Sequence, residues 1–95
     1  MKTSIDEVRE KIDRIDEEMV SLLVKRQKCI EIAALIKNDR SKVFDEGRIE
    51  DVVNKVKKLS VSLGLSLAIA EPLWRKLINL SIEHEFSEFD KKLNK

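Results

Sequence analysis

Apolar residues in the first third of the chain recur every three or four positions. From Ile5 to Ile36 this spacing is interrupted by neither glycine nor proline, which predicts one continuous helix with an apolar stripe along one face. Ser4, with Glu7 three residues later, is typical of a capping box, and the polar stretch 38–47 ends the helix. The stripe consists of Ile5, Val8, Ile12, Ile15, Met19, Leu22, Cys29, Ala33 and Ile36.

The length of this helix predicts a dimer. About 34 residues extend over roughly 50 Å at 1.5 Å per residue, whereas a compact chain of this size has a radius of gyration of about 12 Å. The rest of the chain is therefore too short to cover the stripe. A second copy packed along the exposed part would cover it, so we expect a homodimer.

Two more helices follow. Asp45 is a good N-cap for the second helix, which Gly64 ends. Ser66 can cap the third, but Pro72 implies either a later start or a kink, and this boundary stays open. We expect the lysine-rich tail 91–95 to fray. The second helix has its apolar side at Ile49, Val52, Val53, Val56, Leu59 and Leu63, and the third faces inward with Trp74, Leu77, Ile78, Leu80, Ser81, Ile82, Glu85, Phe86 and Phe89.

Composition agrees with a single all-α domain over residues 1–95, because the chain has only two glycines and one proline. Charged residues make up 39% of the chain but nearly cancel at +1, which argues against a nucleic-acid partner. A chain of 95 residues can bury only a small core, and its one cysteine allows no internal disulfide to compensate. Both features again favour oligomerisation. Since the chain has no long apolar run and no signal-like start, we expect a cytoplasmic protein with no membrane partner.

Arg26 interrupts the apolar stripe at the position that follows Leu22. One interpretation is that its side chain reaches solvent or a structural carboxylate. The other is that it belongs to a pocket for a small dianion. Lys37 projects from nearly the same face about 16 Å further along, although the helix dipole also favours a lysine near a C-terminus.

Three further polar residues are candidates for the same site. Arg9 differs from Arg26 by about 100° around the helix and lies roughly 25 Å away, so within one chain they cannot bind the same small ligand. In an antiparallel dimer, Arg9 of one copy could reach the Arg26 region of the other. Ser81 and Glu85 point inward at i and i+4 of the third helix, and Glu85 could alternatively form a salt bridge with Arg26 or Lys37.

Other kinds of chemistry lack their residues. His84 is the only histidine and Cys29 the only cysteine, so both are expected to be structural, with no metal cluster and no Cys/His nucleophile. No glycine-rich phosphate loop is present. Cations and a few hydrogen-bonding groups in a helical pocket suit a reaction accelerated by positioning and electrostatics.

Almost the whole chain resembles the all-helical AroQ class of chorismate mutases. This resemblance implies an intertwined homodimer with two active sites and no cofactor, acting in the shikimate pathway towards aromatic amino acids. Each site would combine the partner's Arg9 with Arg26, Lys37, Arg48, Ser81 and Glu85 of its own chain. The similar motifs are Val-Arg-Glu-Lys-Ile-Asp-Arg-Ile-Asp from Val8, Leu-Leu-Val-Lys-Arg from Leu22, Ile36-Lys37, Asp45 with Arg48, and Ser81 with Glu85.

The resemblance also implies a role for each residue. Arg26 and the partner's Arg9 would bind the two carboxylates of chorismate, assisted by Arg48 and Ser81. Lys37 would donate a hydrogen bond to the ether oxygen, which gains negative charge as its bond to carbon breaks on the way to prephenate. Such a donor stabilises the transition state more than the ground state, and the carboxylate contacts select the reactive conformer.

The chain departs from typical mutases at three places. The position of Glu85 is often glutamine, and a carboxyl group donates a hydrogen bond only when protonated, so we expect activity to fall as pH rises and Glu85→Gln to flatten the profile. Ile49 follows Arg48 where typical mutases have a glutamate for the ring hydroxyl, and the loop from Lys37 to Arg48 is one residue shorter. The last two features are similar to isochorismate-pyruvate lyases, whereas Asp45 is mutase-like. Ile49 could also be a core residue of the second helix.

The resemblance favours a chorismate mutase and implies that its catalytic residues are Lys37, Glu85 and Arg26. Three alternatives remain: an isochorismate-pyruvate lyase that forms salicylate and pyruvate, an aminodeoxychorismate mutase, and a noncatalytic helical dimer in which Arg26 and Lys37 are structural. Substrate-binding residues are expected at Arg9, Arg26, Lys37, Asp45, Arg48, Ile49, Ser81 and Glu85, with no metal.

Overall fold

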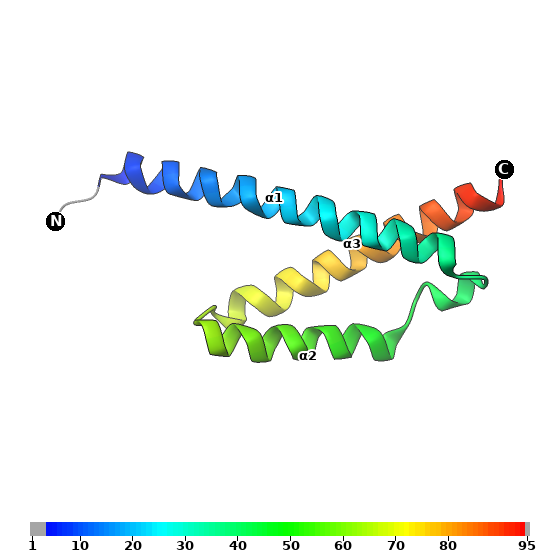
Figure 1. Cartoon of the computed structure of the whole chain (residues 1–95). Coiled ribbons are helices and arrows are strands. Elements are labelled where there is room, and N and C mark those ends of the chain that lie inside the picture. The colour runs from blue at the N-terminus through cyan, green and yellow to red at the C-terminus, as the bar shows by residue number, and fades with distance from the viewer. Residues whose placement is uncertain (1–3, 95) are drawn as a thin grey trace.

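The computed structural model describes residues 4–94, which form three α-helices and a single turn of 3-10 helix (Figure 1). No strand occurs in this part of the chain. The prediction of an all-α fold with a very long first helix is therefore confirmed. The elements are α1 (Ile5–Ile36), η1 (Arg40–Lys42), α2 (Glu46–Leu63) and α3 (Leu67–Leu93).

Local capping residues set several of these boundaries. The Ser4 hydroxyl accepts a hydrogen bond from the Glu7 N–H at 3.2 Å at the start of α1, and Asp45 Oδ1 accepts one from the Arg48 N–H at 3.0 Å at the start of α2. Each side chain satisfies an amide that has no partner within its helix. Gly64 ends α2 with a φ of 87°, a conformation that glycine adopts without the strain of a Cβ.

The start of α3 resolves the boundary that Pro72 left open. Ser66 caps the helix by accepting a hydrogen bond from the Ala68 N–H at 3.3 Å, and α3 then runs through Pro72. A delayed start is therefore wrong. Proline removes the N–H that would bond the carbonyl of Ala68, but both residues are exposed, so water can reach that carbonyl.

The C-terminal end of α3 differs from the expectation of a fraying tail. Lys91, Lys92 and Leu93 are helical, because Lys92 Nζ donates hydrogen bonds to the carbonyls of Ala34 at 2.9 Å and Lys37 at 2.7 Å. These contacts join the last turn of α3 to the end of α1. Lys95 lies outside the described residues.

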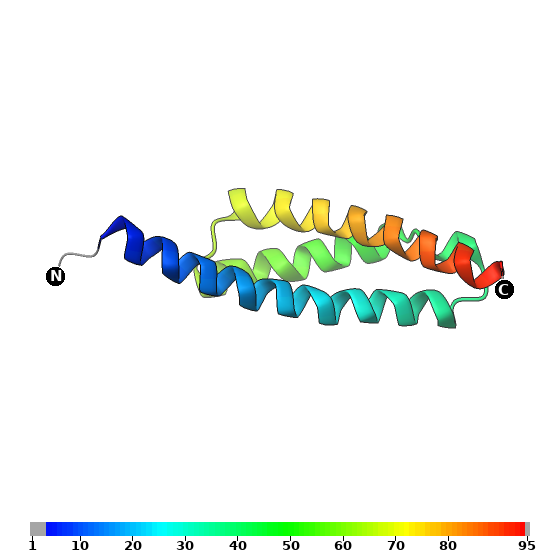
Figure 2. The same cartoon turned by 90° about the horizontal axis from the view of Figure 1, so that it is seen from above.

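The three helices form an elongated molecule. Helix α3 packs against both α1 and α2, and the N-terminal part of α1 extends beyond the other two helices in both views (Figures 1 and 2). The radius of gyration is 16.9 Å, well above the value of about 12 Å for a compact chain of this size. The rest of the chain leaves much of α1 uncovered, as its length predicted.

The core of the single chain is small. Ala34 is the only buried residue of α1, whereas Ile12, Ile15, Met19 and Leu22 of the stripe are 46–62% exposed. Within residues 4–94, no helix combines the length and the apolar character needed to cross a membrane. The buried apolar residues are Ala34, Val43, Val53, Ala70, Ile78 and Phe89.

Candidate active site

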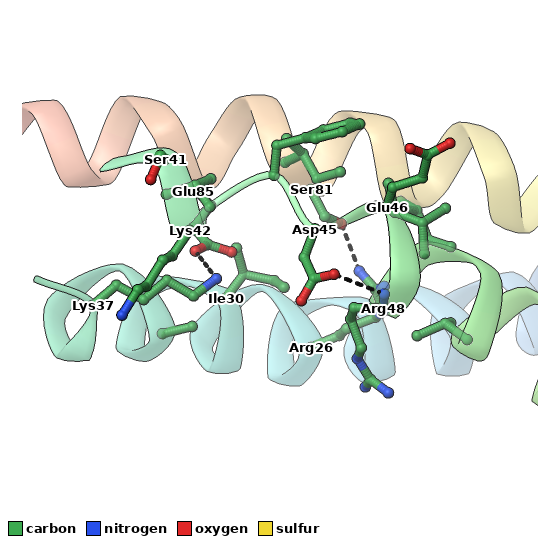
Figure 3. A pocket seen from close by; sticks show the side chains of 17 residues that line it. Arg26, Ile30, Lys37, Ser41, Lys42, Asp45, Glu46, Arg48, Ser81 and Glu85 are labelled. Carbon is green, nitrogen blue, oxygen red and sulfur yellow. Dashed lines mark hydrogen bonds and ion pairs between the residues drawn. The ribbon is translucent and has the colours of Figure 1, made fainter. Parts of the chain in front are cut away.

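A pocket of about 830 Å³ opens between α1, the loop with η1, the start of α2, and α3 (Figure 3). Of the eight residues predicted for the site, one is absent from its lining: Arg9, which is exposed near the start of α1. Residues far apart in sequence thus converge; helical spacing indicated this for Arg26 with Lys37 and for Ser81 with Glu85, whereas Asp45, Arg48 and Ile49 were expected only from the resemblance. The predicted residues that line the pocket are Arg26, Lys37, Asp45, Arg48, Ile49, Ser81 and Glu85.

Arg26 reaches the pocket from the middle of α1. Its Nη1 donates a hydrogen bond to Ser81 Oγ at 2.5 Å, and the Ser81 hydroxyl donates in turn to the Leu77 carbonyl at 2.8 Å. Among residues 4–94, no carboxylate forms an ion pair with Arg26. The interpretation that this arginine meets a structural carboxylate is therefore not supported, and its remaining donors are available to a ligand.

The electrostatics at this end of the pocket favour an anion. Burial, and then the nearby charge of Arg48, lower the pKa of Arg26, although a guanidinium remains protonated at neutral pH. Arg48 forms an ion pair with Asp51 at 2.9 Å, but both side chains are largely exposed, and such a pair stabilises little. An anion bound between Arg26 and Arg48 would relieve their repulsion.

Lys37 and Glu85 form the second polar group of the pocket. Lys37 Nζ donates to Glu85 Oε2 at 2.7 Å, and the Glu85 side chain is only 6% exposed. Of the two partners that the sequence left open for Glu85, Lys37 is the one found. Lys37 is the C-cap of α1, with an extended backbone (φ −66°, ψ 136°), rather than a residue inside the helix. Its ammonium has two further protons for a ligand.

Apolar side chains surround these charges. Apolar and polar side chains thus share the lining, and apolar walls next to convergent polar groups are typical of small-molecule sites, because a lower local dielectric strengthens electrostatic contacts. Ile30 and Ala33 follow Arg26 by four and seven positions, so helical spacing could have found them. The loop residues carry no such signal. The lining residues that sequence reasoning missed are Ile30, Ala33, Ser41, Lys42, Val43, Phe44, Glu46, Val52, Ile78 and Ile82.

Comparison with known families identifies most of the chain. Residues 8–86 match the family model described as chorismate mutase type II. The chain belongs to this family. No curated protein and no solved structure gives a significant match. The family supports a chorismate mutase-type function in general, and all eight predicted site residues fall within the matched stretch.

Lys92, which lies beyond the matched stretch of residues 8–86, contacts the start of the loop at this site. Lys92 Nζ donates to the Lys37 carbonyl at 2.7 Å and lies 4.2 Å from the centroid of the Phe89 ring. It satisfies carbonyls that have no partner at the end of a helix, where the dipole favours a cation. Lys92 continues the inward spacing of Glu85 and Phe89, a signal that extending the helix past Phe89 would have revealed.

Arg40 attaches η1 to α3. Its guanidinium donates to Asp90 through Nε at 2.9 Å and Nη2 at 3.3 Å and lies 4.4 Å from the centroid of the Phe86 ring. The hydrogen bond from Arg40 lowers the pKa of Asp90, which keeps the carboxylate charged. These contacts with α3 therefore hold in place the turn that carries Ser41 and Lys42 into the pocket.

Proposed function

We propose that the protein is a chorismate mutase that converts chorismate to prephenate. One observation carries the proposal: Arg26, with no carboxylate partner in the described chain, faces the same pocket as Arg48 and the Lys37–Glu85 pair. A dianion fits the two arginines, and a donor near its ether oxygen fits Lys37. Membership of the chorismate mutase type II family supports the assignment.

Binding and chemistry use different parts of the pocket. Arg26 and the partner's Arg9 bind the two carboxylates, and Arg48 and Ser81 assist, which holds the substrate in its reactive conformer. Lys37 donates to the ether oxygen while the carbon–oxygen bond breaks and a carbon–carbon bond forms in the same molecule. No proton or electron leaves the substrate. The hydrogen bond strengthens as charge develops on the oxygen, so it lowers the barrier.

The active form that we propose is a homodimer. Arg9 is exposed in the second turn of α1, and the N-terminal part of this helix extends beyond the other two (Figure 1). The stripe residues Ile12, Ile15 and Met19, which follow on the same helix, are about half exposed, and apolar surface of this extent is typical of an interaction site. Two antiparallel copies would cover the stripes and bring each Arg9 to the other copy's Arg26.

A second candidate is an isochorismate-pyruvate lyase, which Ile49 favours. Ile49 lines the pocket and is only partly buried, so an apolar side chain faces the ligand where typical mutases have a glutamate. Asp45 supports the mutase instead. It also lines the pocket, and although its Oδ1 caps α2 through the Arg48 N–H, the other oxygen can accept a hydrogen bond from a substrate hydroxyl.

Separate incubations with chorismate and with isochorismate distinguish these functions. We expect the purified protein to form prephenate from chorismate, as identified by chromatography and mass spectrometry. Salicylate and pyruvate from isochorismate, without prephenate from chorismate, would establish the lyase. No product from either substrate would contradict both and leave the aminodeoxychorismate mutase or a noncatalytic dimer.

An alanine variant tests whether Arg26 is functional or structural. We expect Arg26→Ala to lower kcat/KM by at least about a hundredfold, because a preorganised charged donor is lost, while the protein remains folded. The matched control is Lys25→Ala, since Lys25 is exposed and outside the pocket. Reduced thermal stability with unchanged turnover would instead identify Arg26 as a structural residue.

A further inference from the structure

A second cluster of chemically active side chains lies between α1 and α3, outside the active-site pocket. His84 Nε2 is 2.6 Å from Glu31 Oε2 and 4.0 Å from Glu88 Oε1. The three donor atoms all lie within 4.8 Å of one another, and the side chains are 28–35% exposed. Glu31 belongs to α1, whereas His84 and Glu88 lie on consecutive turns of α3.

We propose that Glu31, His84 and Glu88 form a binding site for a divalent transition-metal ion, with Zn²⁺ as the best match. One imidazole nitrogen and two carboxylate oxygens suit Zn²⁺, which binds them at about 2.0–2.2 Å. In a tetrahedron with such bonds, ligand atoms lie about 3.4 Å apart. Because the donor atoms all lie within 4.8 Å of one another, small side-chain rotations suffice. The fourth position is left for water.

Charge supports the assignment. Two carboxylates and a neutral imidazole carry a charge that a dication balances. With one histidine and one cysteine, the sequence predicted no metal cluster. The fold brings two glutamates next to His84, and they supply the further ligands.

Neighbouring contacts can remain or give way when the ion binds. Gln27 Nε2 donates to Glu31 Oε2 at 3.0 Å, and Lys91 Nζ donates to Glu88 Oε1 at 3.2 Å. Both partners are exposed, so these contacts stabilise little. Gln27 can also turn to the second oxygen of Glu31, as groups that orient metal ligands do.

A metal at this site would join the two helices that carry the active-site residues. His84 directly precedes Glu85 and follows Ser81 by three positions on α3, while Glu31 lies five positions after Arg26 on α1. The ion would therefore fix the position of α3 along α1. The metal site itself does not depend on the proposed reaction, so its test needs no substrate.

Calorimetric titration of the tag-free, chelator-treated full chain with ZnSO₄ tests the site. We expect one Zn²⁺ per chain and a higher Tm in its presence, and no effect of MgCl₂, because Mg²⁺ prefers oxygen ligands in octahedral geometry. His84→Ala and Glu88→Gln should each weaken binding by at least about tenfold. Since His84 is the only histidine, its ring resonances in NMR spectra report directly on the proposed ligand.

The control variant is Cys29→Ser, because Cys29 is an exposed thiol that could bind Zn²⁺ by itself. This variant should bind Zn²⁺ as the wild type does. Glu88→Gln decides the question if His84→Ala does not fold. Absence of stoichiometric binding, binding that Cys29→Ser abolishes and Glu88→Gln retains, or His84 resonances unchanged by Zn²⁺ would each overturn the proposal.

Discussion

At the scale of single residues, the proposed reaction depends on how Lys37 and Glu85 share their hydrogen bond. At 2.7 Å, Lys37 donates and the carboxylate of Glu85 accepts. Glu85 can therefore act in two ways: as a carboxylate that orients Lys37, or as a protonated acid that donates a second hydrogen bond to the ether oxygen. Only the second role requires a proton on Glu85, so the two roles differ in their dependence on pH.

Glu85→Gln separates these roles. If Glu85 donates, wild-type kcat/KM falls as pH rises, because the protonated fraction decreases, and the variant profile is flat, because an amide donates at any pH. The measurement is prephenate formation over about pH 5 to 9. An identical pH profile in both proteins would contradict the donor role and leave Glu85 as a residue that orients Lys37.

At the scale of elements, the sequence predicted helix boundaries that depend on local capping residues better than boundaries that depend on contacts between distant segments. Ser4, Asp45 and Gly64 act on their own helices, so the sequence around each one suffices. The end of α3 depends on Lys92, whose partners lie more than fifty positions away in α1. Lys37 was expected within the helix, but the turn that directs it into the pocket follows no helical periodicity.

The contact between α3 and the end of α1 gives a prediction for Lys92→Met. The variant keeps an unbranched side chain of similar length but loses the hydrogen bonds to the carbonyls of Ala34 and Lys37 and the contact of the ammonium with the Phe89 ring, so we expect the free energy of unfolding to fall by about 1–2 kcal/mol in urea denaturation. We also expect kcat to fall more than KM rises, because the backbone of Lys37 loses its anchor.

Lys91→Met is the matched control, because Lys91 is exposed and its Nζ pairs with Glu88 at 3.2 Å on the same helix rather than with α1. Its effect on unfolding should stay within about 0.5 kcal/mol. Equal effects of the two substitutions on stability and on kcat would show that the Lys92 contacts do not position Lys37.

At the scale of the whole molecule, the single chain lacks both a covered core and one residue of the proposed site. The chain extends over 58 Å, with α1 reaching beyond the other helices. Helical spacing could predict that Arg26, Ser81 and Glu85 face the pocket, because it fixes the face of the helix on which each one lies, whereas Asp45, Arg48 and Ile49 were expected as site residues only from the family resemblance. In the proposed dimer, the position of Arg9 relative to Arg26 depends on the packing of two chains, which spacing along one chain does not give.

Mixed dimers of two inactive variants test the shared site most directly. Arg9→Ala and Arg26→Ala should each abolish prephenate formation alone. Equal amounts refolded together should recover about 25% of wild-type activity, because half of the dimers are mixed and each mixed dimer has one intact site. No recovery in mixtures that contain the mixed dimer, as verified by native mass spectrometry, would contradict a site built from Arg26 and the partner's Arg9.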